Sequence, residues 1–162
     1  MNKRFAAAVS SLSGHWNIIH IVGKGKSFPV EGNSRYRQFE FLGREMSLAY
    51  SIADVALCRA GASSIFELAA ARIPMILVPL GLHQSRGDQI INAKIFAERG
   101  WAVWCDEEQL TPERILELVN EQRVRGHECR VRLESAPGAA TAAKVAQVIL
   151  SLLKRESIAE PF

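Results

Sequence analysis

Strand and helix patterns alternate between Ala53 and Ala93, and this alternation constrains the fold more than any other feature of the sequence. The short apolar run over 54–58 is typical of a parallel strand buried on both faces. The small residues 59–63 predict a tight turn at the carboxyl end of that strand, and a helix is expected over 64–72. Pro74 then prevents the helix from continuing, so that a second buried strand can follow over residues 75–78.

A strand–turn–helix of this kind directs several backbone N–H groups and a helix dipole at one point, which favours the binding of a phosphate. In open α/β sheets, ligands bind outside the carboxyl ends of the strands. We therefore expect a nucleotide phosphate as the ligand of the turn over 59–63.

Helices and buried strands alternate through the rest of the chain as well. Gly100 is expected to end one helix, and Thr111 with Pro112 to begin another. The other expected helices lie over 5–12, 45–53, 87–99 and 139–153, and the other expected strands over 17–22, 38–42 and 101–105. This order predicts the α/β class, with a Rossmann-like parallel sheet and helices on both faces.

One strand of this architecture is missing from the pattern. A doubly wound half normally opens with a strand and a Gly-rich turn, whereas here the first helix has no strand ahead of it. In the usual strand order, 3-2-1-4-5-6, the missing strand is central and lies between 17–22 and 54–58. Its absence would leave two strand edges with unpaired backbone groups. The chain is therefore a fragment, or another polypeptide completes the sheet, or the two flanking strands pair directly.

Composition excludes several classes of protein. The chain has 162 residues, enough for one domain, and a net charge of +3, too small to argue for nucleic acid as a partner. Neither a signal peptide nor a membrane-spanning helix is expected, because no apolar run approaches about 20 residues. Cys58, Cys105 and Cys129 match no metal spacing and are interpreted as reduced core residues of a cytosolic protein. We expect neither a structural metal nor a cofactor.

Four segments together carry a more specific signal than a lone Gly-rich loop. They read HIVGKG (20–25), MSLAYSIADVALCRAGASSIFELAA (46–70), IPMILVPL (73–80) and SRGDQIINA (85–93). In order and spacing they resemble the C-terminal, donor-binding half of the MurG-type two-domain (GT-B) glycosyltransferases of family 28. Such enzymes transfer N-acetylglucosamine from its UDP form to the lipid-linked muramyl pentapeptide of peptidoglycan synthesis. The resemblance covers about residues 15–105.

For the diphosphate and the ribose, the resemblance implies binding roles for residues of the first turn and helix. Ala62, Ser63 and Ser64 would supply N–H groups to the UDP diphosphate. Glu67 would bind the ribose hydroxyls, since a carboxylate can accept two hydrogen bonds from a diol.

For the sugar and the base, the resemblance implies a second group of residues. Asp88 and Gln89 would bind the hydroxyls of the sugar from the start of the next helix. Gly43 and Met46 would lie against the uracil. Arg86 could neutralise phosphate charge as UDP leaves. The catalytic base stays unassigned, because no residue is an obvious candidate.

Each of these residues also has an explanation that involves no ligand. Glu67 has the spacing of a capping box with Ser64, and Ser63 and Ser64 are ordinary N-cap residues. Asp88 and Gln89 would lie in a first helical turn, where the dipole favours acids. Arg86 could be a solvated loop charge.

The aromatic residues and histidines are interpreted mainly as structural. His20 is expected to be a hydrogen-bonded core residue, and His83 is kept only as a loop residue near the site. Trp101 and Trp104 are expected in or on the sheet, without a role in stacking on a ligand.

Three functions remain open from the sequence. The first is the donor half of a MurG-type N-acetylglucosaminyltransferase that acts at the inner face of the cytoplasmic membrane as a peripheral protein. The second is the donor half of another UDP-sugar lipid glycosyltransferase completed by a partner chain, and the third is a non-catalytic remnant. The acceptor-binding N-terminal half of the family is absent, so the lipid-linked acceptor would be met through that missing domain. Residues 1–162 are expected to form a single UDP-sugar-binding domain, with a core over 15–125 and C-terminal helices over 127–155.

Overall fold

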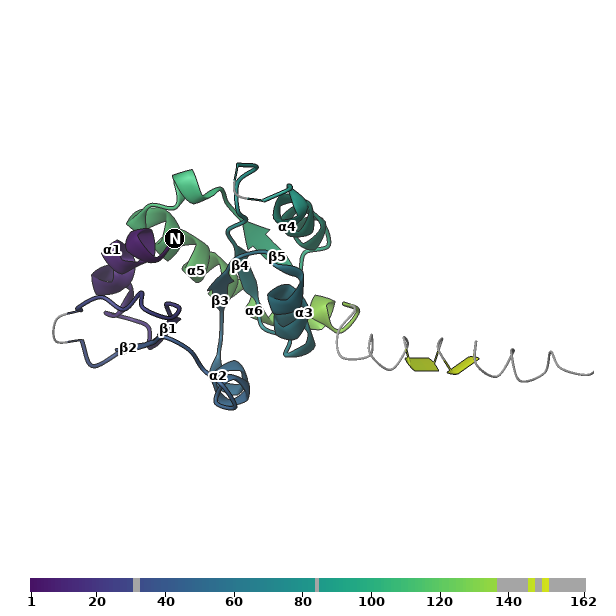
Figure 1. The fold of residues 1–162 in the computed structure, drawn as a ribbon, viewed down its shortest axis with the longest axis horizontal. Coiled ribbons are helices and arrows are strands. Elements are labelled where there is room, and N and C mark those ends of the chain that lie inside the picture. Colours follow the sequence, from purple (N-terminus) through teal and green to yellow (C-terminus); the bar gives the residue numbers. More distant parts are fainter. Residues whose placement is uncertain (31–32, 84, 137–145, 148–149, 152–162) are drawn as a thin grey trace, which may run out of the picture.

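The structure, a computed structural model, describes residues 1–30, 33–83, 85–136, 146–147 and 150–151. Helices and strands alternate along these residues, as the sequence predicts (Figure 1). The strands are β1 (Ile18–Ile21), β2 (Tyr36–Phe39), β3 (Ala56–Cys58), β4 (Met75–Leu77) and β5 (Ala102–Trp104). The helices are α1 (Asn2–Leu12), α2 (Met46–Ile52), α3 (Ala62–Ala70), α4 (Asp88–Glu98), α5 (Pro112–Val124) and α6 (Gly126–Leu133), with a 3-10 turn η1 (Glu107–Gln109).

The strands form two separate parallel sheets, divided at the position of the missing central strand that the sequence predicts. β1 pairs with β2 in one sheet, and β3, β4 and β5 pair in that order in the other. Among the described residues, β1 and β3 do not pair. This excludes the alternative that the two strands beside the missing central strand pair directly with each other. The strand order therefore agrees with a Rossmann-like half that lacks its first strand.

Among the described residues, the inner edges of β1 and β3 have no pairing strand, so their backbone groups are left unpaired. Ile18 donates its N–H to the Arg35 carbonyl at 2.7 Å, so the alternation along the strand turns the backbone groups of Ile19 away from β2. In the same way, Ala56 donates to the Pro74 carbonyl at 2.9 Å, and the backbone groups of Leu57 face away from β4.

Helices cover both faces of the β3–β4–β5 sheet, as predicted, whereas the described helices cover only one face of the β1–β2 sheet, whose residues Ile19, Ile21 and Phe39 are exposed. On one face, α1 and α5 pack against a core that includes residues of both sheets, so these two helices hold the sheets next to each other (Figure 1). On the other face, α3, α4 and α6 pack against β3, β4 and β5. The central strand β4 is completely buried on both faces, which is the pattern of a parallel strand between two helical layers.

Local sequence explains where most helices begin and end. Gly100 follows α4 with a φ of +70°, a left-handed conformation that glycine adopts without strain. Thr111 caps α5 by accepting a hydrogen bond from the Arg114 N–H at 3.2 Å, and Pro112 takes the first helical position. Both boundaries are as predicted. The expected terminal helix over 139–153 lies largely outside the described residues.

Within the described residues, no helix combines the length and the hydropathy that a membrane span requires.

Candidate functional site

The N-terminus of α3 presents free backbone donors at the carboxyl end of β3. Gly61, the N-cap residue, is extended, with φ −71° and ψ 137°, and no side chain caps the helix. The first N–H group that bonds within the helix is that of Ile65, which donates to the Gly61 carbonyl at 3.1 Å. The N–H groups of Ala62, Ser63 and Ser64 are therefore available to an anion, and all three residues are exposed.

Glu67 does not form the capping box that its spacing from Ser64 suggests. α3 begins at Ala62, two residues before the predicted start, so Ser64 lies inside the first turn and is not the N-cap. The Glu67 carboxylate instead accepts a hydrogen bond from the Tyr50 hydroxyl on α2 at 3.0 Å. The pKa of Tyr50 is raised to about 12, mainly by burial and to a smaller extent by this carboxylate.

Asp88 and Gln89 form the first turn of α4. Gly87 caps this helix with a φ of +90°, which a residue with a side chain would adopt only under strain. Gln89 uses its Oε1 atom to accept a hydrogen bond from the Leu80 N–H at 3.1 Å, and no described residue accepts from its amide NH2 group. The Asp88 side chain is exposed at the helix start, where the dipole favours an acid.

Gly43, Met46 and Arg86 lie at exposed or half-exposed positions around these helices. Gly43 precedes α2, where its N–H donates to the Glu45 carboxylate at 3.1 Å and its carbonyl accepts from the Met46 N–H at 3.1 Å. Arg86 is exposed in the loop before α4 and forms no ion pair within the part of the chain that the structure describes.

Side-chain contacts join the three helices that carry the predicted residues. The hydrogen bond between Tyr50 and Glu67 links α2 to α3. The rings of Phe66 and Phe96, with centroids 5.8 Å apart, link α3 to α4. Both α3 and α4 follow parallel strands that are neighbours in the sheet, so their N-termini lie at the same end of the sheet, where the strands have their carboxyl ends.

Two residues of this edge were missed as functional candidates, although both belong to the quoted motifs. Arg59 donates to the carbonyls of Val78 and Pro79, both at 3.2 Å, and pairs with Glu107 at 2.5 Å. Asn92 on α4 donates to the Ala60 carbonyl at 3.0 Å. No local pattern indicates either contact, because the partners lie 19 to 48 residues apart in the sequence.

His20, Trp101 and Trp104 have the structural roles that the sequence suggests. His20 is half-buried, its Nδ1 atom lies 2.9 Å from the Tyr36 hydroxyl, and burial lowers its pKa. Trp101 is buried and donates its indole N–H to the Arg132 carbonyl at 3.0 Å. Trp104 packs partly buried against the same core, and His83 is exposed.

The cysteines are all free. Cys105 and Cys129 are buried, and burial raises the pKa of Cys58 to about 12. Among the described residues, no group of histidine, cysteine and acidic side chains could hold a metal ion.

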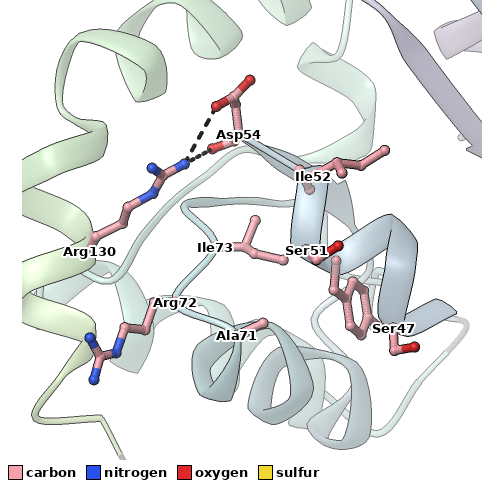
Figure 2. Close-up of a pocket in the computed structure, with 10 residues that line it drawn as sticks. Ser47, Ser51, Ile52, Asp54, Ala71, Arg72, Ile73 and Arg130 are labelled. Carbon is pink, nitrogen blue, oxygen red and sulfur yellow. Dashed lines mark hydrogen bonds and ion pairs between the residues drawn. The ribbon is translucent and has the colours of Figure 1, made fainter.

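A pocket of about 600 Å³ lies at the opposite end of the sheet, where β3 and β4 have their amino ends (Figure 2). Residues just ahead of β3 and β4 line it, among them Asp54 and Ile73. Arg130 of α6 reaches across and pairs with Asp54 at 3.6 Å. Ligands of parallel sheets bind at the carboxyl ends of the strands, so this pocket lies away from the turns that carry the candidate site, although Tyr50, the partner of Glu67, also lines it.

Comparison with known proteins gives the same family from sequence and from structure. Residues 1–149 match the model of the glycosyltransferase family 28 C-terminal domain. The chain is 42% identical over 121 residues to the UDP-N-acetylglucosamine--N-acetylmuramyl-(pentapeptide) pyrophosphoryl-undecaprenol N-acetylglucosamine transferase of Staphylococcus aureus, strain JH9. This alignment covers 75% of the chain and 34% of that enzyme, and strain Newman has a relative with the same identity and coverage.

Comparison with solved structures supports the same family. MurG of Acinetobacter baumannii matches with a TM-score of 0.75 and 28% identity, over 93% of this chain and 45% of that one. The calicheamicin glycosyltransferase CalG4 matches with a TM-score of 0.68 and 20% identity, over 94% of this chain and 40% of its own, which shows the shared fold alone.

The chain spans about a third of the length of the Staphylococcus aureus relatives. The family model, the fold and the order of the sequence motifs all indicate the same family. The chain belongs to glycosyltransferase family 28, whose C-terminal domain it matches, and is homologous to MurG.

Proposed function

We propose that this chain is the donor-binding half of an enzyme that transfers N-acetylglucosamine from UDP-N-acetylglucosamine to a lipid-linked muramyl pentapeptide. The observation that carries the proposal is the arrangement at one sheet edge of two helix N-termini and the carboxylate of Glu67, in a chain 42% identical to transferases named for this reaction. The acceptor would be met through a further domain, and the enzyme would act as a peripheral protein at the inner face of the cytoplasmic membrane.

The donor binds in three parts in this proposal. The N–H groups of Ala62, Ser63 and Ser64 hold the diphosphate, whose charge the dipole of α3 stabilises. Glu67 accepts hydrogen bonds from the ribose hydroxyls and exchanges its bond to Tyr50 for them or shares it with them.

The sugar and the base lie on either side of the diphosphate. Asp88 and the free amide group of Gln89 bind the sugar hydroxyls, and Gly43 and Met46 contact the uracil. As the bond from the anomeric carbon to the diphosphate breaks, negative charge develops on the leaving UDP, and Arg86 offsets part of it. The base that takes the proton of the acceptor hydroxyl is not among these residues.

The open edges of β1 and β3 favour a second polypeptide segment in the working enzyme. Two parallel edges with unpaired backbone groups flank the position of a central strand, and a strand from outside residues 1–162 would satisfy both. A donor half completed in this way accommodates both the MurG-type reaction and the alternative of another UDP-sugar lipid transferase. A non-catalytic remnant would keep donor binding without transfer.

Calorimetric titration of site variants tests the donor site. Glu67→Ala is expected to lower the affinity for UDP and for UDP-N-acetylglucosamine about tenfold, because the ribose contact is common to both. Gln89→Glu keeps the acceptor for the Leu80 N–H but removes the amide donor, so it should weaken the sugar nucleotide more than UDP, while its added charge repels the diphosphate of both.

Glu98→Ala, at the exposed far end of α4, is the matched control and should bind like the parent chain. Unchanged affinity in both site variants would overturn these assignments.

A further inference from the structure

Asn92 ties the sugar-binding end of α4 to the turn that precedes α3. Its Nδ2 atom donates to the Ala60 carbonyl at 3.0 Å, and Ala60 is completely buried. Ala60 directly precedes Gly61, the N-cap of α3, so this bond fixes the backbone from which the free N–H groups of the first turn extend.

Asn92 also shares a helix face with the residues proposed to bind the sugar. It follows Gln89 by three positions and Asp88 by four, the spacing at which helical side chains lie next to one another. Gln89 holds the other neighbouring loop through its bond to the Leu80 N–H at 3.1 Å. One face of α4 therefore positions both the turn after β3 and the loop after β4.

The turn after β3 is also held at its first residue, Arg59. The Arg59 guanidinium, one residue before Ala60, donates to the Val78 and Pro79 carbonyls and pairs with Glu107. With Arg59 bonded to the residues that follow β4 and Ala60 bonded to α4, the turn has hydrogen bonds on both sides before any ligand binds.

We propose that Asn92 is a positioning residue that holds the diphosphate-binding turn at a fixed offset from Asp88 and Gln89, so that diphosphate and sugar are bound together. The inference rests on the proposed function, since it names what aligns the two parts of that site. Binding groups that are held in place before binding contribute more affinity than mobile ones, and small misplacements are costly.

The test is titration of the full chain with UDP and with UDP-N-acetylglucosamine at several pH values. Asn92→Asp has nearly the same shape, but its carboxylate cannot donate to the Ala60 carbonyl until it is protonated. Repulsion from that carbonyl, together with partial burial, should raise the pKa of the new carboxyl above its ordinary value.

At pH 8 the variant should lose about tenfold in affinity for UDP-N-acetylglucosamine and less for UDP, and the loss should shrink as the pH falls toward 5. The parent chain and Asn120→Asp, the same change at an exposed position of α5, should show no such recovery. Asn92→Leu removes the donor without adding a charge and should show the loss at every pH. Circular dichroism at each pH checks that the variants are folded.

The outcomes separate the two proposals. A parent chain that does not bind the sugar nucleotide overturns the proposed function and this inference with it. A parent chain that binds, with folded Asn92 variants of equal affinity and an unchanged ratio between the two ligands, overturns the inference alone.

Discussion

At the scale of single residues, Tyr50 and Glu67 show how a ligand-binding candidate is held before a ligand is present. The sequence suggests that Glu67 either caps a helix or binds a ribose, and the structure excludes the first explanation because α3 begins at Ala62. The partner that the carboxylate does have, Tyr50, lies 17 residues away on another helix. Spacing within one helix can suggest a capping box, but it carries no information about a partner on a neighbouring helix.

The Tyr50 hydroxyl gives a prediction about pH. Its pKa is raised to about 12, and burial also raises the pKa of Tyr36, so neither of the two tyrosines should ionise near pH 10 in the folded chain. Because the folded state favours the protonated form of Tyr50, the associated stability is complete below pH 10 and is lost as the pH rises from 10 toward 12.

Ultraviolet titration of the phenol groups measures this shift directly. Glu67→Gln removes the negative charge beside the hydroxyl and should bring the pKa of Tyr50 closer to 10, while burial keeps it above that value. The signal of Tyr36 serves as the internal control. A Tyr50 pKa that is the same in the parent chain and in Glu67→Gln, both still folded by circular dichroism, would contradict the assigned contact.

At the scale of helices and strands, the sequence predicts the interior of each element better than its pairing. Gly100, Thr111 and Pro112 mark helix boundaries because their backbone preferences act locally. The small residues around Gly61 do not mark one sharply, so the predicted start of α3 is two residues late. The order of the elements indicates the gap between the two sheets, but whether β1 and β3 pair across it depends on contacts between strands distant in the sequence, which no local pattern encodes.

Two isoleucines in strands should differ widely in their contribution to stability. Ile76 of β4 is completely buried, and Ile76→Ala is expected to lower the free energy of unfolding by about 2–5 kcal/mol. Ile19 of β1 is 43% exposed, and Ile19→Ala should cost less than about 1 kcal/mol. Urea unfolding of both variants makes the comparison, and similar costs would argue against the exposure of the Ile19 side chain on its face of the sheet.

The open edge of β1 predicts alternating protection from hydrogen exchange. The Ile18 and Val22 amides donate to β2 and should exchange slowly, whereas the Ile19 and Ile21 amides face away from β2 and should exchange faster. Residue-resolved exchange by NMR measures the four rates. Equal protection of all four amides would mean that another group already pairs with the inner edge.

At the scale of the whole molecule, α1 and α5 hold the two sheets next to each other, and the predicted site lies along one edge of the larger sheet (Figure 1). The turns that carry the residues predicted to bind the diphosphate and the sugar follow β3 and β4, and they lie together because parallel strands bring successive turns to one end of the sheet. Gly43 and Met46 instead follow β2 of the smaller sheet. The hydrogen bonds that Arg59 and Asn92 donate to backbone carbonyls near this site could not be predicted from the sequence, because their partners are distant in the sequence. The chain corresponds to about a third of its relatives, so the proposed transfer requires an acceptor-binding part beyond these residues.

The central claim is that this chain assembles a donor site, and calorimetric titration with UDP-N-acetylglucosamine, alongside UDP-glucose and UDP, tests it most directly. We predict saturable binding at a single site that is tighter for UDP-N-acetylglucosamine than for UDP-glucose, since α4 would bind the sugar itself. A folded chain that gives no binding heat with any of the three nucleotides, and no change in thermal stability when they are added, would contradict the claim.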